Sequence, residues 1–165
     1  MAKTLLIGAN STIAQALQEN SDREFICLAR SEGNLDLDGD LSELNDVSDI
    51  NGLVYFPGTI NLKPFTMLKE EDFINDFKVN VLGAAKVVKK VINQLKESEG
   101  ASVVFISSVA ANVGLPFHAS IGASKSALEG MARALPPEYT NDKISINDEA
   151  TNNKETKLTT NHLKT

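Results

Sequence analysis

The chain has 165 residues, of which 42% are hydrophobic and 23% are charged, and its formal net charge is -6. These values are typical of one globular domain with a single core. The excess of acidic residues argues against a surface that binds nucleic acid or anionic membranes. The single cysteine, Cys27, excludes an internal disulfide and a cysteine-based metal cluster.

The sequence has no run of about 18 apolar residues, the length that a membrane-spanning helix needs. The apolar stretch at the N-terminus is too short for a signal peptide and is typical of a strand. We therefore expect a soluble, cytoplasmic protein with no membrane or nucleic-acid partner and no metal.

The first part of the chain contains short apolar runs separated by polar segments. Residues 3–8 predict a buried strand that ends in glycine, and residues 10–20 predict a helix with capping oxygens at its start. Residues 24–30 predict a second buried strand. The acidic stretch 35–41 has room for a brief third strand, and residues 51–58 predict a fourth strand closed by Pro-Gly.

The second part contains the clearest helical pattern. Apolar residues within 73–95 recur every three or four positions, which predicts a long amphipathic helix. Residues 101–108 predict a fifth strand, and residues 120–135 predict a helix with one stripe of small residues that permits close packing. Residues 143–146 predict a last short strand.

Alternating strands and helices, with strands apolar throughout, indicate a parallel sheet covered on both faces. The expected fold class is therefore α/β, a doubly wound parallel sheet formed by residues 1–147. Residues 148–165 are nearly all polar and lack periodicity, so we expect them to form a disordered tail.

The first strand passes into the first helix through the segment Gly8-Ala-Asn-Ser-Thr-Ile-Ala14. Such a turn directs backbone N–H groups and the positive end of the helix at an anion, for which a cofactor pyrophosphate is the natural candidate. Thr12 and Ala14 stand where two further glycines are usual, so an ordinary strand–helix turn is the alternative.

Six segments follow one another in an informative order: Gly8-x-x-x-Thr12-Ile13-Ala14, Asp40-Leu41, Phe56-Pro-Gly58, Asn80-Val-Leu-Gly83, Ile106-Ser-Ser108 and Ser124-Lys125-Ser-Ala-Leu128. Their order and spacing resemble those of the short-chain dehydrogenase/reductase family. The resemblance implies a Rossmann-like sheet, here ending after its fifth or sixth strand. It also implies hydride transfer between a nicotinamide cofactor and a small-molecule carbonyl or alcohol.

The candidate cofactor-binding residues are Gly8, Asn10, Ser11, Thr12, Ile13, Arg30, Asp40, Leu41, Gly58 and Lys125. By resemblance, Asp40 and Leu41 contact the adenine ring. Lys125 either binds the ribose hydroxyls or is a solvated helix lysine. Arg30 stands where an acidic residue would bind the ribose of NAD, and a guanidinium matches a phosphate, so it favours NADP(H) over NAD(H). The alternative is a surface arginine, with Asp36 or Asp38 reaching the ribose.

The chain departs from the family at the group that transfers the proton. The family pattern is Tyr-x-x-x-Lys, but Ile121 stands four residues before Lys125, and isoleucine has no proton to transfer. His118, in the loop before the helix, is a substitute proton donor or an ordinary loop histidine. Ser120 and Tyr55 are further alternatives.

The candidate catalytic residues are Ser108, Lys125, Asn80 and His118. Ser108 either orients a substrate carbonyl or simply ends a strand. In the family, the residue at Asn80 holds the helix open and binds a water near the lysine. A buried amide in an apolar helix needs hydrogen-bond partners in any case, so we also expect a structural role for Asn80.

The resemblance ends near residue 147, whereas family members continue with segments that build the substrate pocket. We therefore expect a C-terminally truncated family member. The resemblance also implies a homodimer through the 69–98 and 120–135 helices. Alternative functions are a non-catalytic dinucleotide-binding or regulatory protein, or an inactive remnant of the family.

Overall fold

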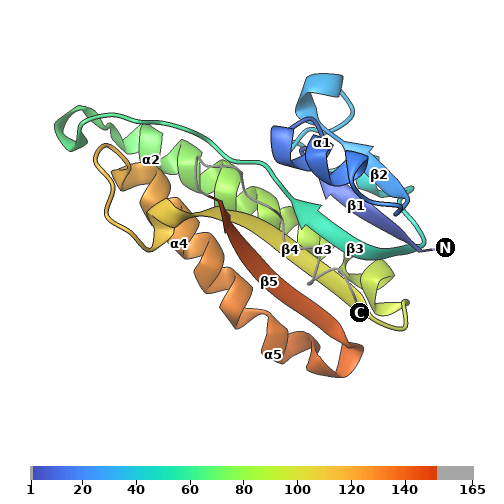
Figure 1. Ribbon diagram of the computed structural model, residues 1–165. Coiled ribbons are helices and arrows are strands. Elements are labelled where there is room, and N and C mark those ends of the chain that lie inside the picture. The colour runs from blue at the N-terminus through green and yellow to red at the C-terminus, as the bar shows by residue number, and fades with distance from the viewer. Residues whose placement is uncertain (1, 152–165) are drawn as a thin grey trace.

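The computed structural model describes residues 2–151 and shows one parallel sheet between two layers of helices (Figure 1). Its strands are β1 (Lys3–Ile7), β2 (Phe25–Leu28), β3 (Ile50–Tyr55), β4 (Ala101–Ser108) and β5 (Ile144–Thr151). The strand order is β2-β1-β3-β4-β5, and every neighbouring pair is parallel. The predicted α/β, Rossmann-like architecture is confirmed.

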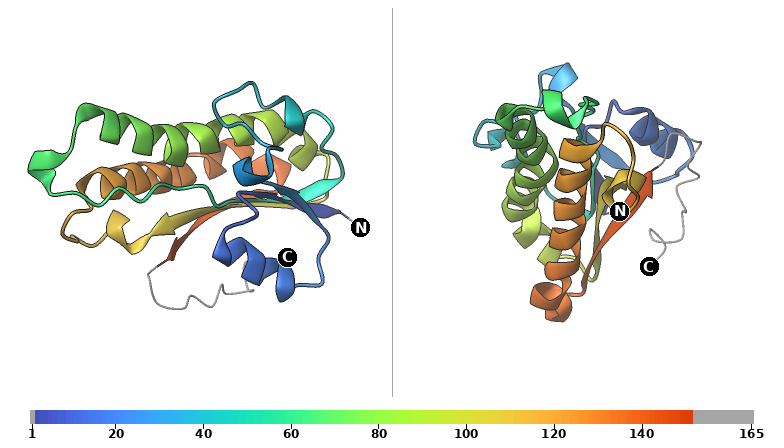
Figure 2. Two further views of the ribbon diagram at one scale, coloured as in Figure 1. Left: turned by 90° about the horizontal axis from the view of Figure 1, so that it is seen from above. Right: turned by 90° about the vertical axis from the view of Figure 1, so that its left-hand side faces the viewer.

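The helices of the described residues are α1 (Thr12–Glu19), α2 (Glu70–Phe77), α3 (Gly83–Lys96), α4 (Ala119–Ala134) and α5 (Pro136–Tyr139). A π-helical turn spans Lys78–Leu82, and short 3₁₀ turns span Arg30–Glu32, Ser42–Leu44, Phe65–Met67, Val109–Ala111 and Thr140–Asp142. Figure 2 shows α1 on one face of the sheet and α2, α3 and α4 on the other. None of these helices is long and apolar enough to cross a bilayer.

Successive residues of each central strand point to opposite faces of the sheet, and both faces are buried. Leu53 and Tyr55 of β3 pack in the core beneath α3 and α4, whereas Val54 between them packs in the core beneath α1. In β4, Phe105 and Ile106 divide between the two cores in the same way. The period-two geometry of a strand therefore explains why these strands are apolar throughout.

The brief strand expected at residues 35–41 is absent, and a turn takes its place. The Asp36 carboxylate accepts a hydrogen bond from the backbone N–H of Asp38 (2.9 Å), and its carbonyl accepts one from Gly39 (3.2 Å). Leu41 has a left-handed backbone with φ of 57°. An acidic side chain that bonds its own backbone in this way favours a turn over a strand.

Residues 73–95 are helical as predicted, but the π-helical turn interrupts the α-helical hydrogen bonding. The Val79 carbonyl in this turn accepts a hydrogen bond from the Tyr55 hydroxyl (2.6 Å). A Cβ atom at Gly83 would lie 2.3 Å from that hydroxyl, so a side chain there does not fit beside Tyr55. Asn80, fully buried within the turn, donates to the Asp76 carbonyl (2.7 Å). These contacts support the structural role expected for Asn80.

The last strand is longer than the predicted strand at 143–146. Residues 148–151, expected in a polar tail, extend β5 and pair with residues 105–108 of β4. Backbone ladders form whatever the side chains are, and Thr151 adds a hydrogen bond from its hydroxyl to the Ser107 carbonyl (3.1 Å). Residues 152–165, the remainder of the expected tail, lie outside the described residues.

Candidate active site

A cavity of about 540 Å³ lies beyond the carboxyl ends of β1, β2 and β3. The chain runs from β1 to β2 on one side of β1 and returns to β3 on its other side, and ligands of doubly wound sheets bind at such a reversal. The lining residues are Gly8, Asn10, Ser11, Ala29, Arg30, Ser31, Leu35, Asp36, Leu37, Asp38, Phe56, Pro57, Gly58, Thr59 and Val79.

The turn between β1 and α1 forms one wall of this cavity. Gly8 has φ of +79°, and a Cβ atom there would lie 3.1 Å from the Pro57 ring, so the turn requires glycine. Ser11 caps α1 by accepting a hydrogen bond from the Ala14 N–H (3.2 Å). The N-terminus of α1 therefore opens at the cavity. Thr12 and Ile13 are not among the lining residues.

The opposite wall follows β2. Arg30 lines the cavity at the start of a 3₁₀ turn, and the Asn10 amide joins the two walls by donating to Ser31 Oγ (2.9 Å) and Glu32 Oε1 (2.7 Å). Asp38 also lines this wall and pairs with Lys78 (2.9 Å). That hydrogen bond and the positive charge of Lys78 lower the pKa of the Asp38 carboxyl.

The structure does not place the predicted adenine-binding pair Asp40-Leu41 at the cavity. The Asp40 carboxylate accepts a hydrogen bond from the Ser42 N–H (3.0 Å), and the Leu41 side chain is buried in the core. Asp36 and Leu37, four residues earlier, line the cavity instead. A turn at residues 36–40 replaces the expected strand, and this accounts for the shift of the cavity-lining pair from Asp40 and Leu41 to Asp36 and Leu37.

Three predicted residues, Gly58, Asn80 and Lys125, come together where Gly58 lines the cavity, although Asn80 and Lys125 are not among its lining residues. Lys125 is 6% exposed, and its ammonium donates to the Ile106 carbonyl (2.7 Å). A Cβ atom at Gly58 would lie 3.2 Å from both Lys125 Nζ and Asn80 Oδ1. Asn80 Oδ1 is buried and has no hydrogen-bond partner in the described structure. Burial lowers the pKa of Lys125 to about 8.

The residues considered for proton transfer are mostly engaged elsewhere. The Tyr55 hydroxyl bonds to Val79, and burial raises the pKa of Tyr55 further above its ordinary value. His118 Nδ1 lies 2.6 Å from the Pro116 carbonyl oxygen. Ile121 is buried among the helices, and Ser108 is half-buried, with its hydroxyl accepting a hydrogen bond from the Ala110 N–H (3.2 Å).

Sequence reasoning missed a buried carboxylate, Asp76, next to this site. Asp76 is 1% exposed and accepts hydrogen bonds from the hydroxyls of Thr59 and Ser120, both at 2.5 Å. The Asn80 amide also donates to Thr59 Oγ1 (3.1 Å). Asp76 stands four residues before Asn80, and this spacing places the two on one helix face. The sequence signal that could have identified Asp76 is its position on the same helix face as Asn80, which was expected to be buried.

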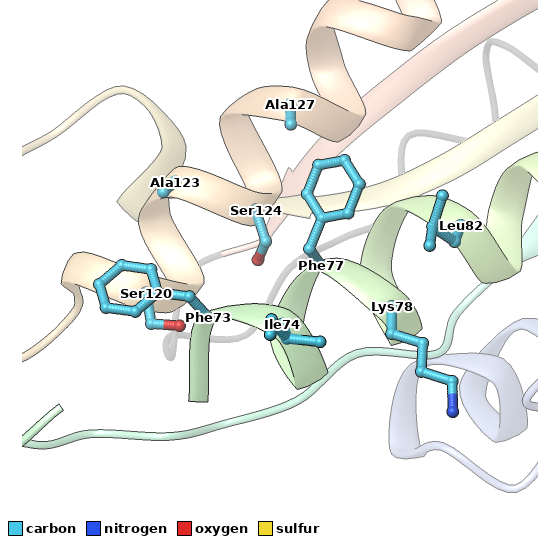
Figure 3. A pocket seen from close by; sticks show the side chains of 9 residues that line it. All are labelled: Phe73, Ile74, Phe77, Lys78, Leu82, Ser120, Ala123, Ser124 and Ala127. Carbon is cyan, nitrogen blue, oxygen red and sulfur yellow. The ribbon is translucent and has the colours of Figure 1, made fainter. Parts of the chain in front are cut away.

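A second cavity, of about 590 Å³, lies between α2 and α4 (Figure 3). Its lining residues are Phe73, Ile74, Phe77, Lys78, Leu82, Ser120, Ala123, Ser124 and Ala127. Phe73 and Phe77 reach toward the small residues of α4, whereas the Lys78 ammonium points away from them (Figure 3). Ala123 and Ala127, two members of the predicted small-residue stripe of the 120–135 helix, therefore line an apolar cavity.

The chain belongs to the short-chain dehydrogenase family, because the family model described as short chain dehydrogenase matches residues 5–165. A short-chain dehydrogenase from Streptomyces avermitilis has a similar structure, with a TM-score of 0.83 and 24% identity, covering 96% of this chain and 68% of that one. An oxidoreductase of the same family from Burkholderia thailandensis has a TM-score of 0.79 and 22% identity, covering 90% and 67% of the two chains. At these identities the likeness supports the fold.

Curated relatives match shorter segments. An uncharacterized oxidoreductase of Thermotoga maritima is 36% identical over 78 residues, which is 47% of this chain and 31% of that protein. The 2,3-dihydro-2,3-dihydroxybenzoate dehydrogenase of Escherichia coli is 28% identical over 104 residues, which is 63% of this chain and 42% of that protein. The matches therefore span less than half the length of these relatives.

Proposed function

We propose that this chain binds NADP(H) in the cavity beyond β1, β2 and β3 and acts as an oxidoreductase on a carbonyl or alcohol. The observation that supports the proposal best is the Gly8 turn at the N-terminus of α1, with Arg30 lining the same cavity. The turn offers backbone N–H groups to a pyrophosphate, and Arg30 offers a charged fork to a 2′-phosphate.

The residues of the cavity fit such a cofactor from end to end. Asp36 and Leu37 would meet the adenine end, and Lys125 would bind the ribose hydroxyls near Gly58. The unpartnered Asn80 Oδ1 beside Lys125 has an acceptor position open to a bound group or water. The nicotinamide, when bound, supplies the hydride chemistry. Ser108, at the end of β4, would hold the substrate oxygen.

Calorimetric titration with NADPH and then with NADH tests the proposal. We expect saturable binding that is tighter for NADPH. Arg30→Ala should weaken NADPH binding by about 10-fold or more, since a hydrogen bond to a charged group contributes about 1.5–3 kcal/mol, and should change NADH binding little. Arg133→Ala, outside the cavity, is the matched control and should behave as wild type. No binding of either dinucleotide would refute the proposal.

A non-catalytic dinucleotide-binding protein is the second candidate, and Ile121 is the observation that favours it. If the site lacks only a phenol, Ile121→Tyr should create or raise NADPH-dependent carbonyl reduction. The expected measurement is loss of NADPH absorbance with an activated dicarbonyl as substrate. NADPH binding without turnover in either wild type or Ile121→Tyr would favour the non-catalytic role.

We also propose that the α2 and α4 faces form a homodimer interface. Ile74, Phe77 and Leu82 are exposed by 54%, 41% and 49% around the apolar cavity. A second copy of these helices would cover them. Sedimentation equilibrium should give twice the monomer mass, and Phe77→Glu should give the monomer mass. Val113→Glu, exposed but outside this face, is the control. A monomeric wild-type protein would refute the interface.

A further inference from the structure

The buried Asp76 carboxylate links the two cavities of the molecule. Thr59, which donates to Asp76 Oδ1, lines the proposed cofactor cavity beside Gly58. Ser120, which donates to Asp76 Oδ2, lines the second cavity, where Figure 3 shows its side chain between α4 and α2. A continuous chain of three hydrogen-bonded groups therefore crosses the protein from one cavity to the other.

Both hydrogen bonds to Asp76 are short. Both oxygen–oxygen distances are 2.5 Å, at the short end of the range for O–H···O hydrogen bonds. An ionised Asp76 accepts both hydroxyl protons, and a protonated Asp76 donates to one hydroxyl oxygen. Either state keeps the chain connected, so a proton can pass along it. Thr59 Oγ1 accepts from Asn80 as well, so a protonated Asp76 that donates to Thr59 fills the second acceptor position of the hydroxyl and leaves the Thr59 proton for a group in the cavity.

Burying a carboxylate without a cation is costly unless hydrogen bonds stabilise it. Besides Asp76, the charged side chains of α2, the π-helical turn and α4 are Glu70, Glu71, Asp72, Lys78, Lys125, Glu129 and Arg133, and Lys63 pairs with Asp72 at 2.8 Å. Each of the three lysines has another partner: Lys63 bonds to Asp72, Lys78 to Asp38, and Lys125 to the Ile106 carbonyl. Asp76 instead takes its side-chain hydrogen bonds from two neutral hydroxyls.

We propose that Thr59, Asp76 and Ser120 form the proton route of the site, in the absence of a tyrosine at position 121. This inference rests on the proposed oxidoreductase function. Thr59 is the catalytic residue, because it lines the cavity, and Asp76 and Ser120 act through it.

Carbonyl reduction by this route is balanced. A bound reduced nicotinamide would supply the hydride to the carbonyl carbon, and Thr59 would give its hydroxyl proton to the carbonyl oxygen. Thr59 takes a proton from the protonated carboxyl group of Asp76, and Asp76 regains one through Ser120 from a hydronium ion of the solvent. The products are the alcohol and the oxidised dinucleotide. Alcohol oxidation follows the same steps in reverse.

The first measurement is NADPH-dependent reduction of phenanthrenequinone, an activated dicarbonyl probe. Thr59→Val and Asp76→Asn keep the shape of the site but break the proton route, and each should lower the rate by about 100-fold or more, since acid–base catalysis contributes about 10²–10⁴-fold. NADPH binding, measured by calorimetry, should stay within about threefold of wild type. Thr59→Ser restores the hydroxyl and should recover the rate. Asp72→Asn, one turn earlier on α2, is the matched control and should retain wild-type activity.

The second measurement needs no turnover. Asp76→Asn identifies the infrared carboxylate band of Asp76 in the protein, and this band should shift when NADPH binds. Thr59→Val should abolish the shift, because it disconnects Asp76 from the cavity. A merely structural Asp76 would give no response that depends on Thr59.

The outcomes separate the inference from the proposed function. Failure to bind NADPH refutes the proposed function and, with it, the inference. Binding without reduction of the probe by the wild-type protein overturns the proton route and also counts against the proposed oxidoreductase activity. Reduction that survives Asp76→Asn and Thr59→Val overturns the proton route alone. An Asp76 band that does not respond to NADPH also overturns it.

Discussion

The buried ammonium of Lys125 should make the stability of the protein depend on pH. Burial lowers the pKa of Lys125 from 10.5 to about 8 in the folded protein, whereas the unfolded chain keeps the ordinary value. Between these two pH values the unfolded chain binds the extra proton, so the free energy of unfolding rises with pH. At about 1.36 kcal/mol for each pKa unit, the full rise is about 3 kcal/mol. The penalty is fully present below pH 8 and relieved toward pH 10.5.

Urea denaturation of wild type and Lys125→Met at several pH values from 7 to 10 measures this effect. The methionine variant leaves the Ile106 carbonyl without its donor, which lowers its stability at every pH. Therefore only the pH dependence of the difference in free energy of unfolding between wild type and Lys125→Met reports the buried charge. Between pH 7 and 10, the free energy of unfolding of wild type should rise by most of the roughly 3 kcal/mol relative to that of Lys125→Met. The control Lys89→Met changes an exposed lysine, and its free energy of unfolding should vary with pH as that of wild type does. Parallel curves for Lys125→Met and wild type would refute the reasoning.

Two further predictions concern local geometry. Gly83→Ala places a methyl group 2.3 Å from the Tyr55 hydroxyl and should lower the free energy of unfolding by about 1–3 kcal/mol. Tyr55→Phe removes the obstructing oxygen, so Gly83→Ala should lower the free energy of unfolding by less in the Tyr55→Phe protein than in wild type. Equal losses in the two proteins would contradict the clash. Ser11→Ala removes the cap of α1 and should cost about 1 kcal/mol, whereas Ser11→Asp should retain most of the stability. Equal losses in the two Ser11 variants would show that capping is not the cause.

The local patterns of the sequence predicted the elements that depend on their own residues. Strands buried on both faces must be apolar throughout, and a helix that packs on one side must repeat its apolar residues, so β1, β3, β4 and α4 could be placed from the sequence. The turn at Gly8 was predictable for the same reason, because only glycine tolerates its left-handed backbone beside Pro57. The turn lies on the cavity, and phosphate binding there stays a prediction.

Other features depend on contacts between residues far apart in the chain. The π-helical turn at Lys78–Leu82 places the Val79 carbonyl where the Tyr55 hydroxyl satisfies it, 24 positions away. Asp76 meets Thr59 and Ser120 across 17 and 44 positions. No local pattern encodes such pairings, because they exist only after the sheet and α4 have brought the segments together.

The sequence by itself therefore determined the α/β class, the order of the main elements and the motifs of the family, because each depends on local periodicity or on one residue's backbone. Tertiary structure alone decided that Asp36 and Leu37, and not Asp40 and Leu41, line the cavity beyond β1, β2 and β3. It also brought Lys125 to Asn80 beside Gly58 and enclosed Asp76 between two cavities. Burial and proximity are properties of the packed chain, and they set both the pKa of Lys125 and the hydrogen-bonded route through Asp76.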